Sequence, residues 1–158
     1  MGAKSEAIAK KFEGKAQEAI AILKKLSDAD WKKMTEAEKW SVAATAHHMA
    51  GAPDAVTGIA RALASGNFRT DFTRAALDVM NAAHAKEYAN CSRAETIALF
   101  EKGSSAAAAV VRGLSDEQLA KTGTVFADLP PMSVEQLIYG GLIDHLGEHL
   151  KSIRKAVG

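Results

Sequence analysis

Apolar residues recur at helical spacing along most of the chain. From Ser5 to Leu26 they form one stripe that includes Ile8, Phe12 and Leu23, while lysines and glutamates occupy the opposite face. The same spacing predicts further helices from about Trp40 to Ala64, about Thr73 to Ala89, Ser92 to about Gly113, and Ser133 to Val157. No segment alternates with a period of two for long enough to predict a strand.

Short polar motifs mark the ends of these helices. Capping boxes at Thr35–Glu38, Ser92–Glu95 and Ser133–Gln136 predict three helix starts, the first of them leading into the helix near Trp40. The segment Ser27–Asp30 breaks the helical pattern, Ser115–Leu119 adds a single turn, and Lys121–Pro131 is expected to be irregular. The sequence therefore predicts an all-α fold, an antiparallel four-helix bundle with additional short connecting helices, in a single domain over residues 1–158.

Composition and charge exclude several classes of protein. The 158 residues carry 20 Lys and Arg against 19 Asp and Glu, and a net charge of +1 argues against a nucleic-acid partner. One cysteine cannot form a disulfide framework. No apolar run approaches the length of a membrane span, and the start of the chain does not resemble a signal peptide. We therefore expect a cytoplasmic protein with neither a membrane nor a nucleic-acid partner.

Two histidines on the last predicted helix are the first candidates for chemistry. His145 and His149 are four residues apart, so their rings project from one face about one turn apart. Ile138, Leu142 and Ile153 share that face, which marks it as the buried side. An unpaired polar group there costs about 1–3 kcal/mol, so the two rings need partners. Hydrogen bonds to neighbouring groups would supply them, and so would a shared metal ion.

A third ligand would come from the second predicted helix, where His47 and His48 are adjacent. Neighbouring helical residues point about 100° apart, so one of the two at most can face the core. Counting from Trp40 places His48 on the face of Trp40 and His47 off it, which favours His48 without excluding His47. The order His145-x-x-Glu148-His149 also matches an inverted zinc-protease motif, but only nine residues follow His149, too few for the further ligand.

Other polar residues receive no role in the chemistry. Asp144 and Glu148 are expected on a solvated helix face, and Cys91 is expected to be an inert thiol in a loop. His84, on the third predicted helix, is expected at the surface or satisfied by hydrogen bonds.

These residues together resemble the DinB/YfiT-like superfamily. The resemblance rests on Trp40-Ser41-Val42, on His48 eight positions after the tryptophan, and on the terminal pattern His145-x-x-x-His149-Leu150-x-x-Ile153. It implies a four-helix bundle in which three histidines bind one divalent metal ion, here His48, His145 and His149. Zn, Ni and Fe all suit such ligands. Members often carry Glu at the position of Ala44, so a contact behind the ligands is expected to be missing.

The resemblance also implies a function. Three neutral imidazoles leave a divalent ion its full charge and an open coordination position, where it can lower the pKa of bound water to about 7 or hold a thiolate. Characterised relatives include S-transferases and isomerases that use bacillithiol, mycothiol or glutathione, and many are homodimers. We therefore expect a metal-dependent hydrolase or thiol S-transferase acting on a small molecule. The alternatives are a non-catalytic, stress-associated metal- or ligand-binding bundle, and a bundle with buried histidines and no metal.

Overall fold

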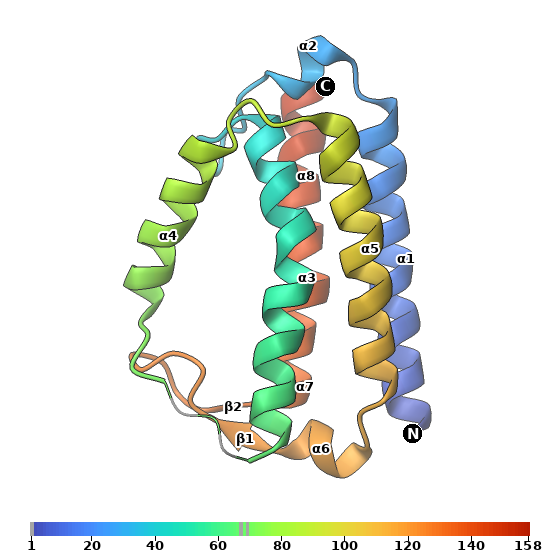
Figure 1. Ribbon diagram of the computed structural model, residues 1–158, viewed down its shortest axis with the longest axis vertical. Helices are drawn as coiled ribbons and strands as arrows, with labels where there is room; N and C mark the ends of the chain where they lie inside the picture. Colours follow the sequence, from blue (N-terminus) through green and yellow to red (C-terminus); the bar gives the residue numbers. More distant parts are fainter. Residues whose placement is uncertain (1, 67, 69) are drawn as a thin grey trace.

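A computed structural model describes residues 2–66, 68 and 70–158, and within them four helical segments pack side by side as a bundle (Figure 1). Three of these segments are α1 (Ala3–Lys25), α3 (Val42–Ala64) and α5 (Arg93–Arg112). The fourth consists of α7 (Val134–Ile138), the π-helical η1 (Tyr139–Asp144) and α8 (His145–Val157). The predicted all-α bundle is confirmed, with helix ends within a few residues of those expected.

The apolar residues whose spacing predicts the helices form the buried core of the bundle. Ile8, Phe12 and Leu23 of α1 are each at most 1% exposed, and they join a core to which every bundle helix contributes. Phe12 and Phe100 are the largest side chains that are fully buried. Burial of this apolar surface is the main stabilising contribution to the fold.

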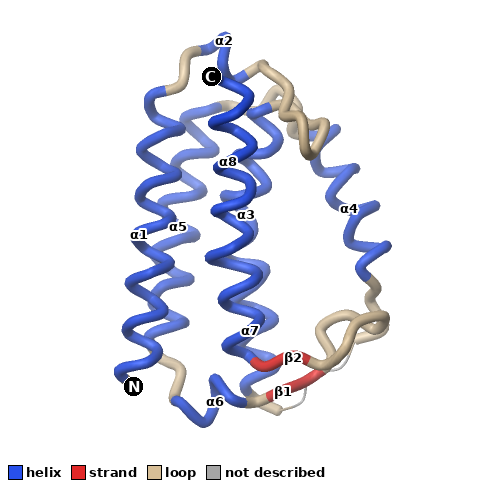
Figure 2. The backbone as a smooth tube through the Cα atoms, turned by 180° about the vertical axis from the view of Figure 1, so that it is seen from behind, coloured by secondary structure: helices blue, strands red, loops and turns tan. Residues whose placement is uncertain are grey.

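A fifth long helix, α4 (Arg74–Glu87), stands outside the bundle (Figures 1 and 2). It carries the chain back to the end of the molecule where α3 begins, so that α5 runs in the same direction as α3. The sequence analysis expected an antiparallel bundle. This prediction is wrong in part, because α3 and α5 run in the same direction (Figure 1). Ala85 is the buried residue of α4, while Val79 and Met80 are 71% and 57% exposed.

Two connecting segments differ from the prediction. The break expected at Ser27–Asp30 is instead the start of a one-turn helix, α2 (Asp28–Trp31). Its cap is the Ser27 side chain, which accepts a hydrogen bond from the backbone N–H of Asp30 while the Asp30 carboxylate accepts one from the N–H of Ser27. The irregular stretch after α6 (Asp116–Ala120) is flanked by two short antiparallel strands, β1 (Thr122–Gly123) and β2 (Met132–Ser133).

The segment Thr35–Glu38 does not cap a helix. It lies in a turn closed by a hydrogen bond of 2.8 Å from the Thr35 N–H to the Trp40 carbonyl, and Lys39 adopts a φ of 63° within it. The helix begins later, where the Ser41 side chain accepts a hydrogen bond from the N–H of Ala44. The capping-box prediction is therefore wrong, because the hydroxyl of Thr35 bonds within its own turn.

The last helix is interrupted by a π-helical segment that the sequence analysis did not predict. Five of its buried residues, Val134, Ile138, Leu142, Leu146 and Leu150, follow one another every four positions, and Leu137, Ile143 and Ile153 are buried beside them. In an α-helix with 3.6 residues per turn, each such step drifts by about 40° around the axis, so the stripe would soon leave the core. The wider turn of η1 compensates for that drift.

In the part of the chain that the structure describes, no helix combines the length and the apolar character that crossing a membrane requires.

Candidate metal centre

Three histidine side chains converge between α3 and α8. His48 comes from the second turn of α3, and His145 and His149 come from the first two turns of α8. The His48 and His145 Nε2 atoms are 2.8 Å apart, and the His145 and His149 Nε2 atoms are 3.1 Å apart. One ligand atom from each residue lies within 4.8 Å of the others. The two segments singled out by sequence thus meet at one point.

The turn before α3 supports the cluster from behind. The Glu38 Oε1 atom lies 2.8 Å from the Nδ1 of His149, whose ring hydrogen it accepts. The Trp40 ring stacks on His149 at 6.1 Å between centroids and meets the edge of His48 at 5.3 Å. Such a partner fixes the orientation of a metal-binding imidazole and increases its basicity. The carboxylate expected to be missing at Ala44 is therefore supplied to His149 from Glu38.

Burial keeps two rings of the cluster, those of His48 and His145, neutral. Burial, and then the neighbouring rings of His145 and His149, lower the pKa of His48 to about 3. Burial followed by His149 lowers the pKa of His145 to about 4. Burial opposes ionisation of Glu38, but hydrogen bonds, that of His149 among them, outweigh it and hold the pKa of this carboxyl below its usual value. At neutral pH His48 and His145 are therefore neutral, and one carboxylate lies behind His149.

The positions of the ring hydrogens and lone pairs in the cluster are compatible with a bound cation. Because His149 gives its ring hydrogen to Glu38, its Nε2 carries a lone pair. The Nε2 of His145 faces both other Nε2 atoms but can offer them one hydrogen, and its Nδ1 is buried with no hydrogen-bond partner among the described residues. A divalent cation would accept the lone pairs of all three Nε2 atoms. Nitrogens bound to one zinc ion at about 2.0–2.1 Å lie about 3.3 Å apart, so the His48–His145 and His145–His149 pairs need to separate by about half an ångström or less.

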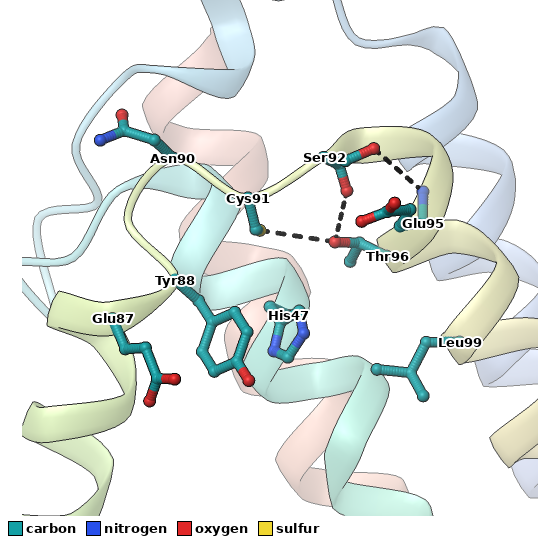
Figure 3. Close-up of a pocket in the computed structure, with 9 residues that line it drawn as sticks. All are labelled: His47, Glu87, Tyr88, Asn90, Cys91, Ser92, Glu95, Thr96 and Leu99. Carbon is teal, nitrogen blue, oxygen red and sulfur yellow. Dashed lines mark hydrogen bonds between the residues drawn. The ribbon is translucent and has the colours of Figure 1, made fainter.

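His47 turns away from this cluster, so that His48 is the one of the two adjacent histidines that lies in it. Its Nδ1 lies 2.8 Å from the Nε2 of His84 on α4, and its ring stacks on Tyr88 at 3.8 Å between centroids. It lines a pocket of about 470 Å³ formed with Tyr88, Leu99 and the segment around Cys91 (Figure 3). The helical phase counted from Trp40 therefore agrees with the structure in placing His48, and not His47, beside His145 and His149.

The remaining residues considered in the sequence analysis lie outside the cluster. Asp144 and Glu148 are exposed, as expected. Burial raises the pKa of the Cys91 thiol, which lies 3.4 Å from the Ala43 carbonyl. His84 bonds through Nε2, but its Nδ1 is buried without a hydrogen-bond partner among the described residues, so it is only partly satisfied.

Glu38 is the residue of the site that sequence reasoning missed. It was placed in a predicted capping box, at the start of a helix. Ser41 provides the signal that could have found it, because an N-cap residue immediately before the apolar run of α3 leaves Glu38 and Trp40 in the preceding loop.

Comparison with known proteins supports the family predicted from the sequence. Residues 12–137 match the family described as mycothiol maleylpyruvate isomerase N-terminal domain, a match that includes His48 and ends before His145. A solved structure, an uncharacterized protein from Clostridium difficile 630, is similar with a TM-score of 0.77 and 15% identity over 98% of this chain and 96% of that one. At this identity the likeness shows the fold alone. No curated protein matches the sequence. The chain belongs to the mycothiol maleylpyruvate isomerase N-terminal domain family, a metal-binding family of the DinB/YfiT-like superfamily.

Proposed function

We propose that the chain is a divalent-metal-dependent enzyme that uses a low-molecular-weight thiol, with His48, His145 and His149 as metal ligands. One observation carries the proposal: three imidazole Nε2 atoms converge, and Glu38 orients one of the rings. A closed structural site normally holds four protein ligands. Three histidines among the described residues instead favour a site with room for an exogenous ligand.

When bound, the ion supplies a positive charge that lowers the pKa of a thiol or water at its open position. The protein residues provide the conditions for this. The burial of His48 and His145 keeps their lone pairs available at neutral pH. The turn of Glu38 and Trp40 holds His149 in one orientation. Because all three ligands are neutral, the site keeps a net positive charge that favours an anionic nucleophile.

The family description supports a thiol as that nucleophile, because it names an isomerase that uses mycothiol. In the transfer reaction the thiol gives up its proton and its sulfur forms a bond to an electrophilic carbon of a small molecule. The leaving group departs with the electron pair of the broken bond and takes up a proton. Hydrolysis would use water at the same position, so a comparison of thiol and water as nucleophiles belongs in the test.

The test begins with elemental analysis of protein purified without a nickel column or chelator. We expect about one equivalent of a first-row metal in the wild type, and loss of that metal in His48→Ala and in His149→Ala. The loaded protein is then assayed for consumption of a thiol with a model electrophile. Wild type that stays metal-free after incubation with Zn, Ni and Fe(II) would refute the proposed centre.

The second candidate, a metal- and ligand-binding bundle without turnover, is favoured by the same open site. It would be established by a stoichiometric metal ion that binds a thiol without any conversion of electrophiles. The expected homodimer and cytoplasmic location stay predictions, and sedimentation of the purified chain would test the first of them.

A further inference from the structure

One close contact between the two helical segments that carry the candidate ligands lies at a glycine. A Cβ atom added to Gly141 in η1 would lie 3.0 Å and 3.1 Å from the Cγ1 and Cγ2 atoms of Val56 on α3. These distances are shorter than ordinary van der Waals contacts. The side chain of Val56 is β-branched and has one strongly preferred rotamer in a helix, so it cannot turn aside easily.

The neighbouring glycine provides a comparison within the same helical turn. A Cβ added to Gly140 would meet no atom within 4 Å. Each glycine destabilises a helix by about 1 kcal/mol relative to alanine. Of these two glycines, Gly141 is the one at which a close approach to another helix accounts for a residue without a side chain.

The contact lies near the candidate metal centre, on the same two helical segments that carry its histidines. Gly141 lies four residues before His145, in the π-helical segment that leads directly into α8. Val56 lies eight residues after His48 on α3, about 12 Å along the axis at 1.5 Å per residue. The His48 and His145 Nε2 atoms are 2.8 Å apart, and one zinc ion would hold them about 3.3 Å apart. A separation of the two helices much beyond about half an ångström would therefore carry these atoms out of reach of one ion.

We propose that the contact between Gly141 and Val56 sets the distance between the two ligand-bearing helices, and that Gly141 is thereby a positioning residue for His145. This inference rests on the proposed metal centre. The π-helical segment brings the two roles together, because it keeps the apolar stripe of the last helix on the core while its glycine admits α3. Segments of this kind often occur at functional sites.

The experiment measures zinc affinity by competition with a chromophoric chelator, together with thermal unfolding of the metal-free protein. Gly141→Ala is expected to weaken zinc binding at least about 10-fold, as loss of a supporting contact behind a metal ligand typically does. Gly140→Ala is the matched control, since it makes the same chemical change in open space. It should leave the affinity within about twofold of the wild type, a range well inside the 10-fold step.

A compensating change separates positioning from general damage. The double variant Val56→Ala/Gly141→Ala removes the methyl groups that the new Cβ would meet, and most of the wild-type affinity should return. Unfolding of the metal-free variants shows whether stability and affinity change together. A structural role alone would lower the midpoint of Gly141→Ala without changing the affinity of its folded fraction.

The outcomes are distinct. Wild-type affinity in Gly141→Ala, or equal losses in Gly140→Ala and Gly141→Ala, would overturn the inference. If Gly141→Ala does not fold, the double variant decides. A folded double variant that binds zinc supports the inference, whereas one that fails to fold or to bind zinc refutes it, because the cost would then not arise at Val56. Wild type that binds no metal would instead refute the proposed function.

Discussion

His47 and His48 are neighbours in sequence, yet they belong to different histidine clusters. His48 is half-buried between α3 and α8 and faces two further Nε2 atoms. His47 points about one quarter-turn away, to a single partner on α4 and a stacked tyrosine. We call the first the triad (His48, His145 and His149) and the second the pair (His47 and His84). The comparison teaches that helical phase, rather than residue type or proximity in sequence, decides which imidazole can share a cation.

The sharpest way to break this comparison is to remove one member of each cluster. His48→Ala deletes one of three ligands, and its effect on zinc affinity should exceed the about 10–100-fold typical of an outer-shell change. His47→Ala should keep one equivalent of metal with nearly unchanged affinity. Chelator competition on the purified proteins measures both. A larger loss in His47→Ala than in His48→Ala would reverse the assignment of the two rings.

Acidification should affect the triad next most strongly. Burial and the neighbouring rings hold the pKa of His48 at about 3 and that of His145 at about 4, below the ordinary 6.5. Between these values the unfolded chain binds more protons than the folded protein, so stability is fully present above about pH 6.5 and is lost as the pH falls. Each ring contributes up to about 1.4 kcal/mol per pH unit.

The free energy of unfolding of the metal-free protein, measured by denaturant titration from pH 7.5 to 4.5, tests this expectation. The His145→Gln variant should lose about one proton's share of the slope. The two rings of the pair, whose pKa values burial also lowers, lie in a less buried place and should contribute less. An unfolding free energy independent of pH below 6.5 would contradict the burial of neutral rings.

A smaller effect is expected from the carboxylate behind the triad. Glu38→Gln removes the charge that orients His149, and zinc affinity should fall about 10–100-fold. Glu36→Gln is the matched control two residues earlier, because Glu36 is exposed and pairs with Lys155 at the surface. Isothermal titration with zinc compares the two, and equal affinities would exclude an orienting role for Glu38.

The smallest effect concerns the pair itself. His84→Ala removes the hydrogen bond between α4 and α3 and should destabilise the protein by about 0.5–1.5 kcal/mol. Because α4 buries little else, hydrogen exchange should speed up within Arg74–Glu87 before it does so in the bundle. Metal content should stay at the wild-type level. Loss of the metal in this variant would show that pair and triad act as one site.

The sequence predicts those parts of the molecule that depend on periodicity. The stripes of α1, α3 and α5 give their helices, and counting along α3 from Trp40 identifies His48. Glu38 escapes prediction because the motif around it satisfies the rules for a helix start equally well. Only the tertiary setting, with His149 above it, shows that it stays in a turn.

The π-helical segment can be predicted from the sequence only in part. Five of the buried apolar residues from Val134 to Leu150 follow one another in four-residue steps, with Leu137 and Ile143 buried between them. Such steps drift around an α-helix, which is a sign of the irregularity in the sequence. Its position, directly before His145, requires the structure. The position of α4 outside the bundle is also known only from the structure, since a moderately apolar helix can pack inside or outside a bundle.

The packing of Trp40 against the triad gives the protein its own optical reporter. The indole lies 5.3 Å from the His48 ring and stacks on that of His149, so occupation of the site changes the surroundings of one fluorophore directly. The other tryptophan, Trp31, is 7% exposed and donates its indole hydrogen to the Cys91 carbonyl, an environment set by other residues. Emission from a Trp31→Phe variant would therefore follow binding at the triad in real time, without any added dye.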